Sequence, residues 1–285
     1  IWALNTENPV RQHWLLAAIA RIIEVDADLA ERLSTAIADA PDLRRIAIAR
    51  WDLDGPVRRW RVEGLSPFDS IHDIKATAHH LVFSDLPFVV EPAAFAGRPR
   101  TLRAQSHTSL WFVAKADLAA TPPGGTVRAT EVRLPIPTGH LYVDHDEVDA
   151  KVRVVAQHAP LADLTLVLAP DDTDHRGGRP LPPAYEGMIT VAVQPSVIGR
   201  YVIDPATGDV HDAEVAHDTE RVWGGVLPTT DIYSERARAH QRQLWYVGAG
   251  HDPDLVPEAW WRLYGDATDG VVAPEDLPDH PIPGS

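Results

Sequence analysis

The sequence has no cysteine, a single methionine and a shortage of basic residues. Without cysteine, the chain can form neither disulfides nor thiolate metal sites. It holds 26 Lys and Arg against 41 Asp and Glu, so its net charge is −15. This charge repels phosphate backbones, and no basic stripe interrupts it, so we expect no nucleic-acid partner.

Long apolar runs are also absent. The longest apolar stretch, residues 14–23, is interrupted by Arg21 and is shorter than the roughly 18 apolar residues of a membrane span. We therefore expect no transmembrane segment, while peripheral contact with a membrane surface stays open. The chain begins Ile-Trp-Ala-Leu-Asn, without an initiator Met or a basic leader. This start is typical of a fragment, so the missing leader carries little information on targeting. The location that we expect is cytoplasmic.

Short runs of alternating apolar residues, separated by turn signals, are abundant instead. Residues 45–51 are apolar at every second position, Asp52 to Gly55 form a turn signal, and residues 57–62 follow as the second half of a hairpin. Further strands are expected at residues 80–83, 110–113, 126–134, 150–155, 164–168, 199–203 and 244–247. Many short strands with regular turns are typical of an all-β sandwich, barrel or propeller.

Helical signal is thin and is confined to residues 26–40. Residues 171–183 contain Gly-Gly and Pro-Pro pairs and are expected to form an exposed loop. Residues 273–285 hold four prolines and little that can pack, so we expect a disordered tail. The expected folded domain is therefore residues 1–272.

Residues 72–87, with the sequence HDIKATAHHLVFSDLP, carry the most informative pattern. A His-Asp pair opens one strand, and a second, apolar strand ends in Asp-Leu-Pro. This order and spacing resembles a signature of the carotenoid oxygenase family, which includes carotenoid cleavage and lignostilbene dioxygenases. Residues 125–131, 137–140, 199–208 and 244–248 are similar to later segments of that family. The resemblance implies a seven-bladed β-propeller, incomplete in this chain because the family is longer.

The resemblance also implies a non-haem Fe(II) site. In this family four neutral imidazoles bind the iron, which leaves two positions open for O₂ and substrate. The expected reaction is oxidative cleavage of a C=C bond in an apolar conjugated substrate, namely a carotenoid, apocarotenoid or stilbene. His72 matches the second ligand and His140 matches the third, while Asp146 corresponds to a carboxylate that supports a ligand.

The sequence departs from the family pattern at several other positions. Ile37 stands where the first ligand should be, Ala20 and Val226 stand where supporting glutamates are expected, and the fourth ligand would lie beyond Ser285. Loss of a ligand together with its supporting carboxylates is what relaxed selection on the metal produces. We therefore expect weak iron binding and no cleavage at a useful rate. Whether the chain is an enzyme stays open; the alternative is a degenerate propeller that acts as a ligand- or protein-binding scaffold, or a non-functional fragment.

Simpler interpretations exist for most of these residues. A strand histidine such as His72 often bonds only to a backbone carbonyl. His79 and His80 are neighbours that point to opposite faces of a strand, and we interpret both as solvated or packing residues. His145 lies between two aspartates and is interpreted as part of a polar turn in preference to a cation site. The pair Trp260-Trp261 is expected to serve packing.

Overall fold

The computed structural model describes residues 2–6, 32, 46–65, 71–85, 101, 103–160, 162–190, 197–217, 221–228, 244–250 and 256–264. Over these residues the chain is mostly β-sheet, with few helices. It divides into two compact units. Unit 1 comprises Ile1–Ser70, Val90–Leu102 and Val113–Ala129, and unit 2 comprises Ile71–Val89, Arg103–Phe112 and Thr130–Ser285.

Unit 1 contains one four-stranded sheet in the order β1-β2-β3-β7. Its strands are β1 (Trp2–Thr6), β2 (Ile46–Arg50), β3 (Arg58–Glu63) and β7 (Thr126–Arg128). The antiparallel pairing of β2 with β3 confirms the predicted hairpin, whereas β7 runs parallel to β3. On β3, Trp60 and Val62 are buried between exposed neighbours. The Trp60 indole donates a 2.7 Å hydrogen bond to the Thr121 carbonyl, just after helix α4 (Lys115–Ala120).

The first sheet of unit 2 has the order β4-β5-β6-β8. Its strands are β4 (Ile71–Ala76), β5 (His80–Asp85), β6 (Thr108–Ala114) and β8 (Thr130–Leu134). The single strand predicted over residues 126–134 is therefore wrong. It is broken at Ala129, because β7 pairs with β3 whereas β8 pairs with β6.

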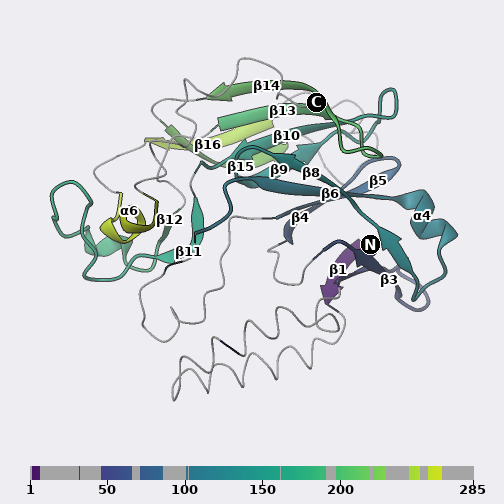
Figure 1. The fold of residues 1–285 in the computed structure, drawn as a ribbon, viewed down its shortest axis with the longest axis horizontal. Helices are drawn as coiled ribbons and strands as arrows, with labels where there is room; N and C mark the ends of the chain where they lie inside the picture. Colours follow the sequence, from purple (N-terminus) through teal and green to yellow (C-terminus); the bar gives the residue numbers. More distant parts are fainter. Residues whose placement is uncertain are drawn as a thin grey trace. The chain divides into compact units, whose positions relative to one another are not determined.

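The second sheet of unit 2 has the order β14-β13-β10-β9, and all its pairs are antiparallel (Figure 1). Its strands are β9 (Thr138–Val143), β10 (Val152–His158), β13 (Val197–Ile203) and β14 (Val210–His217). Apolar side chains of this sheet and of the first sheet share one buried cluster. Val82, Leu110, Phe112, Val132 and Leu134 come from the first sheet, and Leu141, Val152, Val154, Tyr201 and Ile203 from the second.

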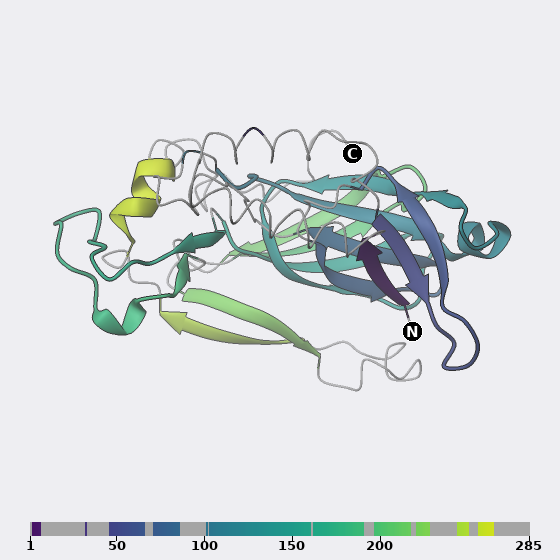
Figure 2. The ribbon, with the colours of Figure 1, turned by 90° about the horizontal axis from the view of Figure 1, so that it is seen from below.

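Smaller elements complete unit 2. They are β11 (Asp163–Val167), η2 (Pro183–Tyr185), β12 (Ile189–Thr190), β15 (Arg221–Pro228), β16 (Leu244–Gly250) and α6 (Glu258–Tyr264). Figure 2 shows the antiparallel β15–β16 pair along its length. Trp260 of α6 is 1% exposed and packs with Leu166 of β11, so its predicted packing role is confirmed.

The loop predicted over residues 171–183 is anchored by a buried carboxylate. The buried Asp174 carboxylate accepts hydrogen bonds from the backbone N–H groups of Gly177 and Arg179, at 2.5 and 2.9 Å. The His175 ring stacks on Trp261 with centroids 4.2 Å apart. The sequence did not predict α6, which supplies that tryptophan.

The all-β prediction is confirmed at the level of sheet content, and the two four-stranded sheets of unit 2 are of the size that a propeller blade has. The seven-bladed ring and the single domain over residues 1–272 stay predictions. Ala20, Ile37 and residues 273–285 lie outside the described residues, as does the predicted helix 26–40 except for Arg32. Within the described residues, the helices are too short and too polar to cross a membrane.

A buried polar network sits in the second sheet of unit 2. His158 is fully buried, and its Nδ1 lies 3.0 Å from the Ile136 carbonyl, while its Nε2 lies 2.7 Å from the Tyr201 hydroxyl. Because a carbonyl only accepts hydrogen bonds, Nδ1 carries the proton and Nε2 accepts one from Tyr201. Burial lowers the pKa of His158 to about 4, although backbone hydrogen bonds from its ring partly oppose this shift.

The stability of the chain should therefore depend on pH through His158. An unfolded histidine has a pKa of about 6.5, so between pH 6.5 and 4 the unfolded chain binds a proton that the folded chain excludes. The free energy of unfolding should fall as the pH is lowered through this window, by up to about 3 kcal/mol from this group. Denaturant titrations at several pH values measure this loss. A His158 ring that titrates near pH 6.5 by NMR in the folded chain would contradict the prediction.

Gly199 is required by the same network. Tyr201 lies two residues further along β13, and a Cβ at position 199 would overlap its ring and hydroxyl. We expect Gly199→Ala to lower the free energy of unfolding by roughly 1–3 kcal/mol, as overpacking does. Gly139→Ala on β9 is the matched control, since its Cβ would meet only the end of the Gln157 side chain at 3.3 Å. Equal losses for the two variants in denaturant melts would show that the Tyr201 contact is not limiting.

Candidate metal centre

The His-Asp pair of the sequence motif lies at the start of β4. In the pairing with β5, Ile71 faces Asp85 and Asp73 faces Ser84, so His72 is the extra residue of a β-bulge. Bulges re-aim side chains and disrupt the simple alternation of a strand. His72 therefore has no directly opposite residue on β5, and its imidazole lies outside the described part of the chain.

Asp73 connects β4 to β9, the strand that carries His140. Its Oδ2 accepts a 3.1 Å hydrogen bond from the N–H of Leu141 and lies 3.7 Å from Nδ1 of His140, and its Oδ1 pairs with Lys75 at 2.9 Å. The two sequence-predicted ligands, His72 and His140, therefore lie on strands that touch each other.

Burial alone would raise the pKa of Asp73. The interactions with His140 and Lys75 and the N–H of Leu141 outweigh that cost and hold the pKa at about 2. The carboxylate is therefore ionised at neutral pH. It provides a fixed negative charge next to the candidate ligand on β9.

His140 suits a metal-binding role in one respect. An imidazole that faces a carboxylate through Nδ1 presents Nε2 as its metal-binding nitrogen, an arrangement common among histidine ligands. The His140 side chain is 43% exposed, so an ion can reach it. Among the side chains that the structure describes, however, no group of three or more His, Asp or Glu residues is arranged to hold a metal. The described residues thus fit one histidine ligand with its supporting carboxylate.

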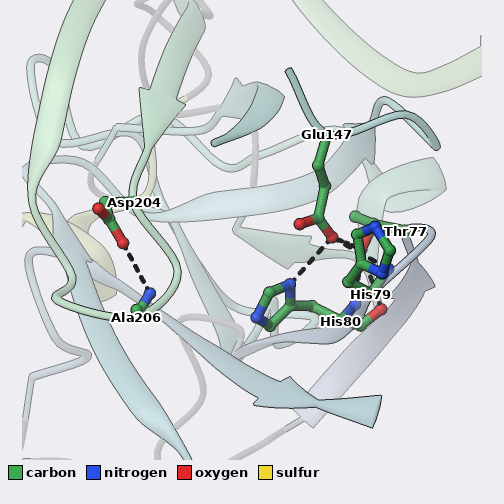
Figure 3. Close-up of polar contacts among 6 residues, drawn as sticks. All are labelled: Thr77, His79, His80, Glu147, Asp204 and Ala206. Carbon is green, nitrogen blue, oxygen red and sulfur yellow. Dashed lines mark hydrogen bonds and ion pairs between the residues drawn. The ribbon is translucent and has the colours of Figure 1, made fainter. Parts of the chain in front are cut away.

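Asp146, the supporting carboxylate expected from the sequence, lies exposed in the turn after β9. Its neighbour Glu147 is the buried acid, with a side chain only 3% exposed. Glu147 Oε1 accepts hydrogen bonds from the Thr77 hydroxyl, from the His79 N–H at 3.1 Å and from Nδ1 of His80 at 2.9 Å (Figure 3).

The sequence interpretation of this region was correct in part. His79 is exposed, and the turn before Glu147 is polar, with Asp144 paired to Arg153 at 2.8 Å. The partnership of His80 with Glu147 was missed. No sequence signal separates Asp146 from Glu147, because the direction of each acid depends on how the turn docks against residues 77–80.

Glu147 is held in its ionised form. Burial raises its pKa, but the hydrogen bonds from Thr77 and His80 outweigh burial, and the pKa is lowered overall. Because the carboxylate only accepts hydrogen bonds, Nδ1 of His80 is the donor in their 2.9 Å contact.

Val226, which stands where the resemblance expects a supporting glutamate, lies in the backbone of β15. Its side chain lies outside the described part of the chain, as do Ala20 and Ile37 entirely. The roles of His72, His140 and Asp146 as metal-site residues stay predictions.

The contact of Asp73 with β9 should contribute to the free energy of unfolding. Asp73→Asn removes the charge that receives the Leu141 N–H and faces His140, so we expect the free energy of unfolding to fall by about 1–2 kcal/mol. Asp146→Asn at the exposed turn should change it by less than about 0.5 kcal/mol. Urea denaturation of both variants at neutral pH measures the difference. A larger effect at Asp146 would contradict the assignment of Asp73 as the linking acid.

Among known proteins, similarity to this chain is found only at the level of solved structures. No protein-family model matches the chain, and no curated protein matches it. Among solved structures, a lignostilbene dioxygenase from Pseudomonas brassicacearum is similar over 63% of this chain, with 15% sequence identity and a TM-score of 0.33. The chain spans 35% of the length of that enzyme.

Proposed function

We propose that this chain is a carotenoid-oxygenase-like protein that binds Fe(II) through His72 and His140. The observation that carries the proposal is the contact of Asp73 with β9. Asp73 follows His72 directly, and its carboxylate lies 3.7 Å from Nδ1 of His140. Two histidines that are 68 positions apart in the sequence (140 − 72) are thus carried by strands in contact, as a shared metal requires.

Each residue has a distinct role in this proposal. His140 and His72 supply neutral imidazole nitrogens, which suit Fe(II). Asp73 orients the His140 ring through Nδ1, and Asp146 is the candidate for further support near the turn. Fe(II), when bound, supplies the capacity to activate O₂ for cleavage of a C=C bond. The substrate class that we propose is an apolar conjugated alkene, such as a carotenoid, apocarotenoid or stilbene.

The site so proposed has two histidines where the family uses four. Each lost ligand removes one bond and part of the preorganisation, so iron should be held weakly and turnover should be low. A scaffold that has lost the iron chemistry is the competing hypothesis. The two hypotheses differ in one measurable property, which is whether iron binding depends on His72 and His140.

The test is an anaerobic Fe(II) titration of the purified chain. We expect weak, saturable binding that falls at least tenfold in His140→Ala and in His72→Ala, as loss of a ligand requires. His211→Ala is the matched control, because His211 is an exposed histidine of β14 with no place in the proposed site. Aldehyde formation from a stilbene and from an apocarotenal is measured in parallel.

Two outcomes would contradict this proposal in different ways. Fe(II) binding that is absent, or equal in the wild-type chain and all three variants, would favour the scaffold. Near-stoichiometric iron after desalting, with turnover abolished by His72→Ala, would show that the site is complete and that the expected weakness is wrong.

A further inference from the structure

Two carboxylates join the β4–β5 hairpin to β9 and the turn that follows it. One belongs to β4 and the other to the turn after β9. Asp73 extends from β4 to the N–H of Leu141 on β9, at 3.1 Å. Glu147 extends from the turn after β9 back to Thr77, His79 and His80, in the turn between β4 and β5. A backbone hydrogen bond of 2.7 Å from the Ala78 N–H to the His145 carbonyl lies beside the second contact.

The two contacts lie near the start of β4 and just after its last residue, Ala76. Asp73 and Thr77 are four residues apart, which corresponds to roughly 13 Å of extended strand. A single contact would allow β4 to pivot against β9. Two contacts at that separation fix both the distance and the angle between the strands.

The Glu147 contact is built to be rigid. Its Oε1 receives three donors, from the Thr77 hydroxyl, the His79 N–H and the His80 ring (Figure 3). The Thr77 hydroxyl also accepts a 2.8 Å hydrogen bond from the His80 N–H, and Thr77 is fully buried. Charge-assisted hydrogen bonds of this kind are stronger than neutral ones, so the turn is held against Glu147 at several points.

We propose that Glu147 is a positioning residue that, together with Asp73, fixes the strands of His72 and His140 relative to each other. This inference rests on the proposed function for its metal-binding consequence. The hydrogen bonds that Glu147 accepts come from Thr77, His79 and His80, so its effect on the candidate ligands is transmitted through β4. Metal–imidazole bonds tolerate errors of only about 0.2 Å, and a strand that pivots would exceed that tolerance.

The experiment compares Glu147→Ala and Glu147→Gln with Tyr264→Phe in the full chain. Tyr264→Phe is the matched control, because its hydroxyl donates a 2.6 Å hydrogen bond to the buried Asp163 and accepts one from the Ala104 N–H. It removes a buried hydrogen-bonded group elsewhere in unit 2 and leaves both contacts between β4 and β9 intact. Glu147→Gln keeps an acceptor oxygen without the charge, and it serves if the alanine variant fails to fold.

Two readouts are needed. The first is hydrogen exchange of the Leu141 amide by NMR, which requires no metal. We expect exchange at least tenfold faster in Glu147→Ala, an intermediate rate in Glu147→Gln and an unchanged rate in Tyr264→Phe. The second is titration with Co(II) alone, followed by its visible spectrum. We expect the affinity to fall about tenfold and the spectrum to change in the Glu147 variants only.

The outcomes test the positioning role of Glu147 separately from the proposed metal site. Unchanged Leu141 exchange in both Glu147 variants, or equal changes in Tyr264→Phe, would overturn the positioning role. Normal Co(II) affinity in Glu147→Ala with fast Leu141 exchange would overturn its link to the metal. A wild-type chain that binds no Co(II) would overturn the proposed function, and the contact between the strands would then be judged by Leu141 exchange.

Discussion

The arrangement of the candidate site depends on the ionised carboxylate of Asp73. β9 is an edge strand of its sheet, and the N–H of Leu141 points away from β10 toward that edge, where Asp73 receives it at 3.1 Å. A side chain thus takes the place that a neighbouring strand would occupy. An edge N–H group without such an acceptor would be exposed to water or to another chain.

This contact has an electrostatic cost that the surrounding residues offset. Asp73 is mostly buried, and burial by itself disfavours its charge, yet its pKa is held at about 2. Glu147 shows the same balance, with a lowered pKa despite a side chain that is 3% exposed. The charge of each acid is stabilised by several hydrogen-bond donors. If those donors move away, the buried charge is left without partners and destabilises the fold.

Strand positions followed from the sequence more reliably than polar contacts did. The apolar residues in 45–51 and the alternation in 57–62 predicted the β2–β3 hairpin. Residues 46–49 of β2 are buried on both faces, whereas on β3 only Trp60 and Val62 are buried. The break at Ala129 was not predictable, since it depends on which sheets the two halves of the segment join. Helix α6 was missed because its seven residues are stabilised by packing of Trp260 and not by a long periodic pattern.

The site was predicted only as far as its motif reached. The choice of His72 and His140 follows from the resemblance, and the structure places their strands, β4 and β9, in contact. The acids that connect these strands do not follow from the resemblance. The sequence-based prediction that His79 and His80 are neighbours on one strand was wrong. β4 ends at Ala76 and His80 begins β5, with His79 in the turn between them, so the two-residue alternation of a strand does not relate these histidines to His72.

Gly199 and Tyr201 also constrain how this protein can diverge. The tyrosine ring occupies the space above the glycine, and its hydroxyl meets the neutral ring of His158 on the next strand. The Tyr201 and His158 side chains fit only while each keeps its size and hydrogen-bonding character and while position 199 has no side chain. Among related sequences, these positions are therefore expected to covary. A larger residue at position 199 should occur together with a smaller one at 201 and with an apolar residue in place of His158, so the three columns would change as one unit.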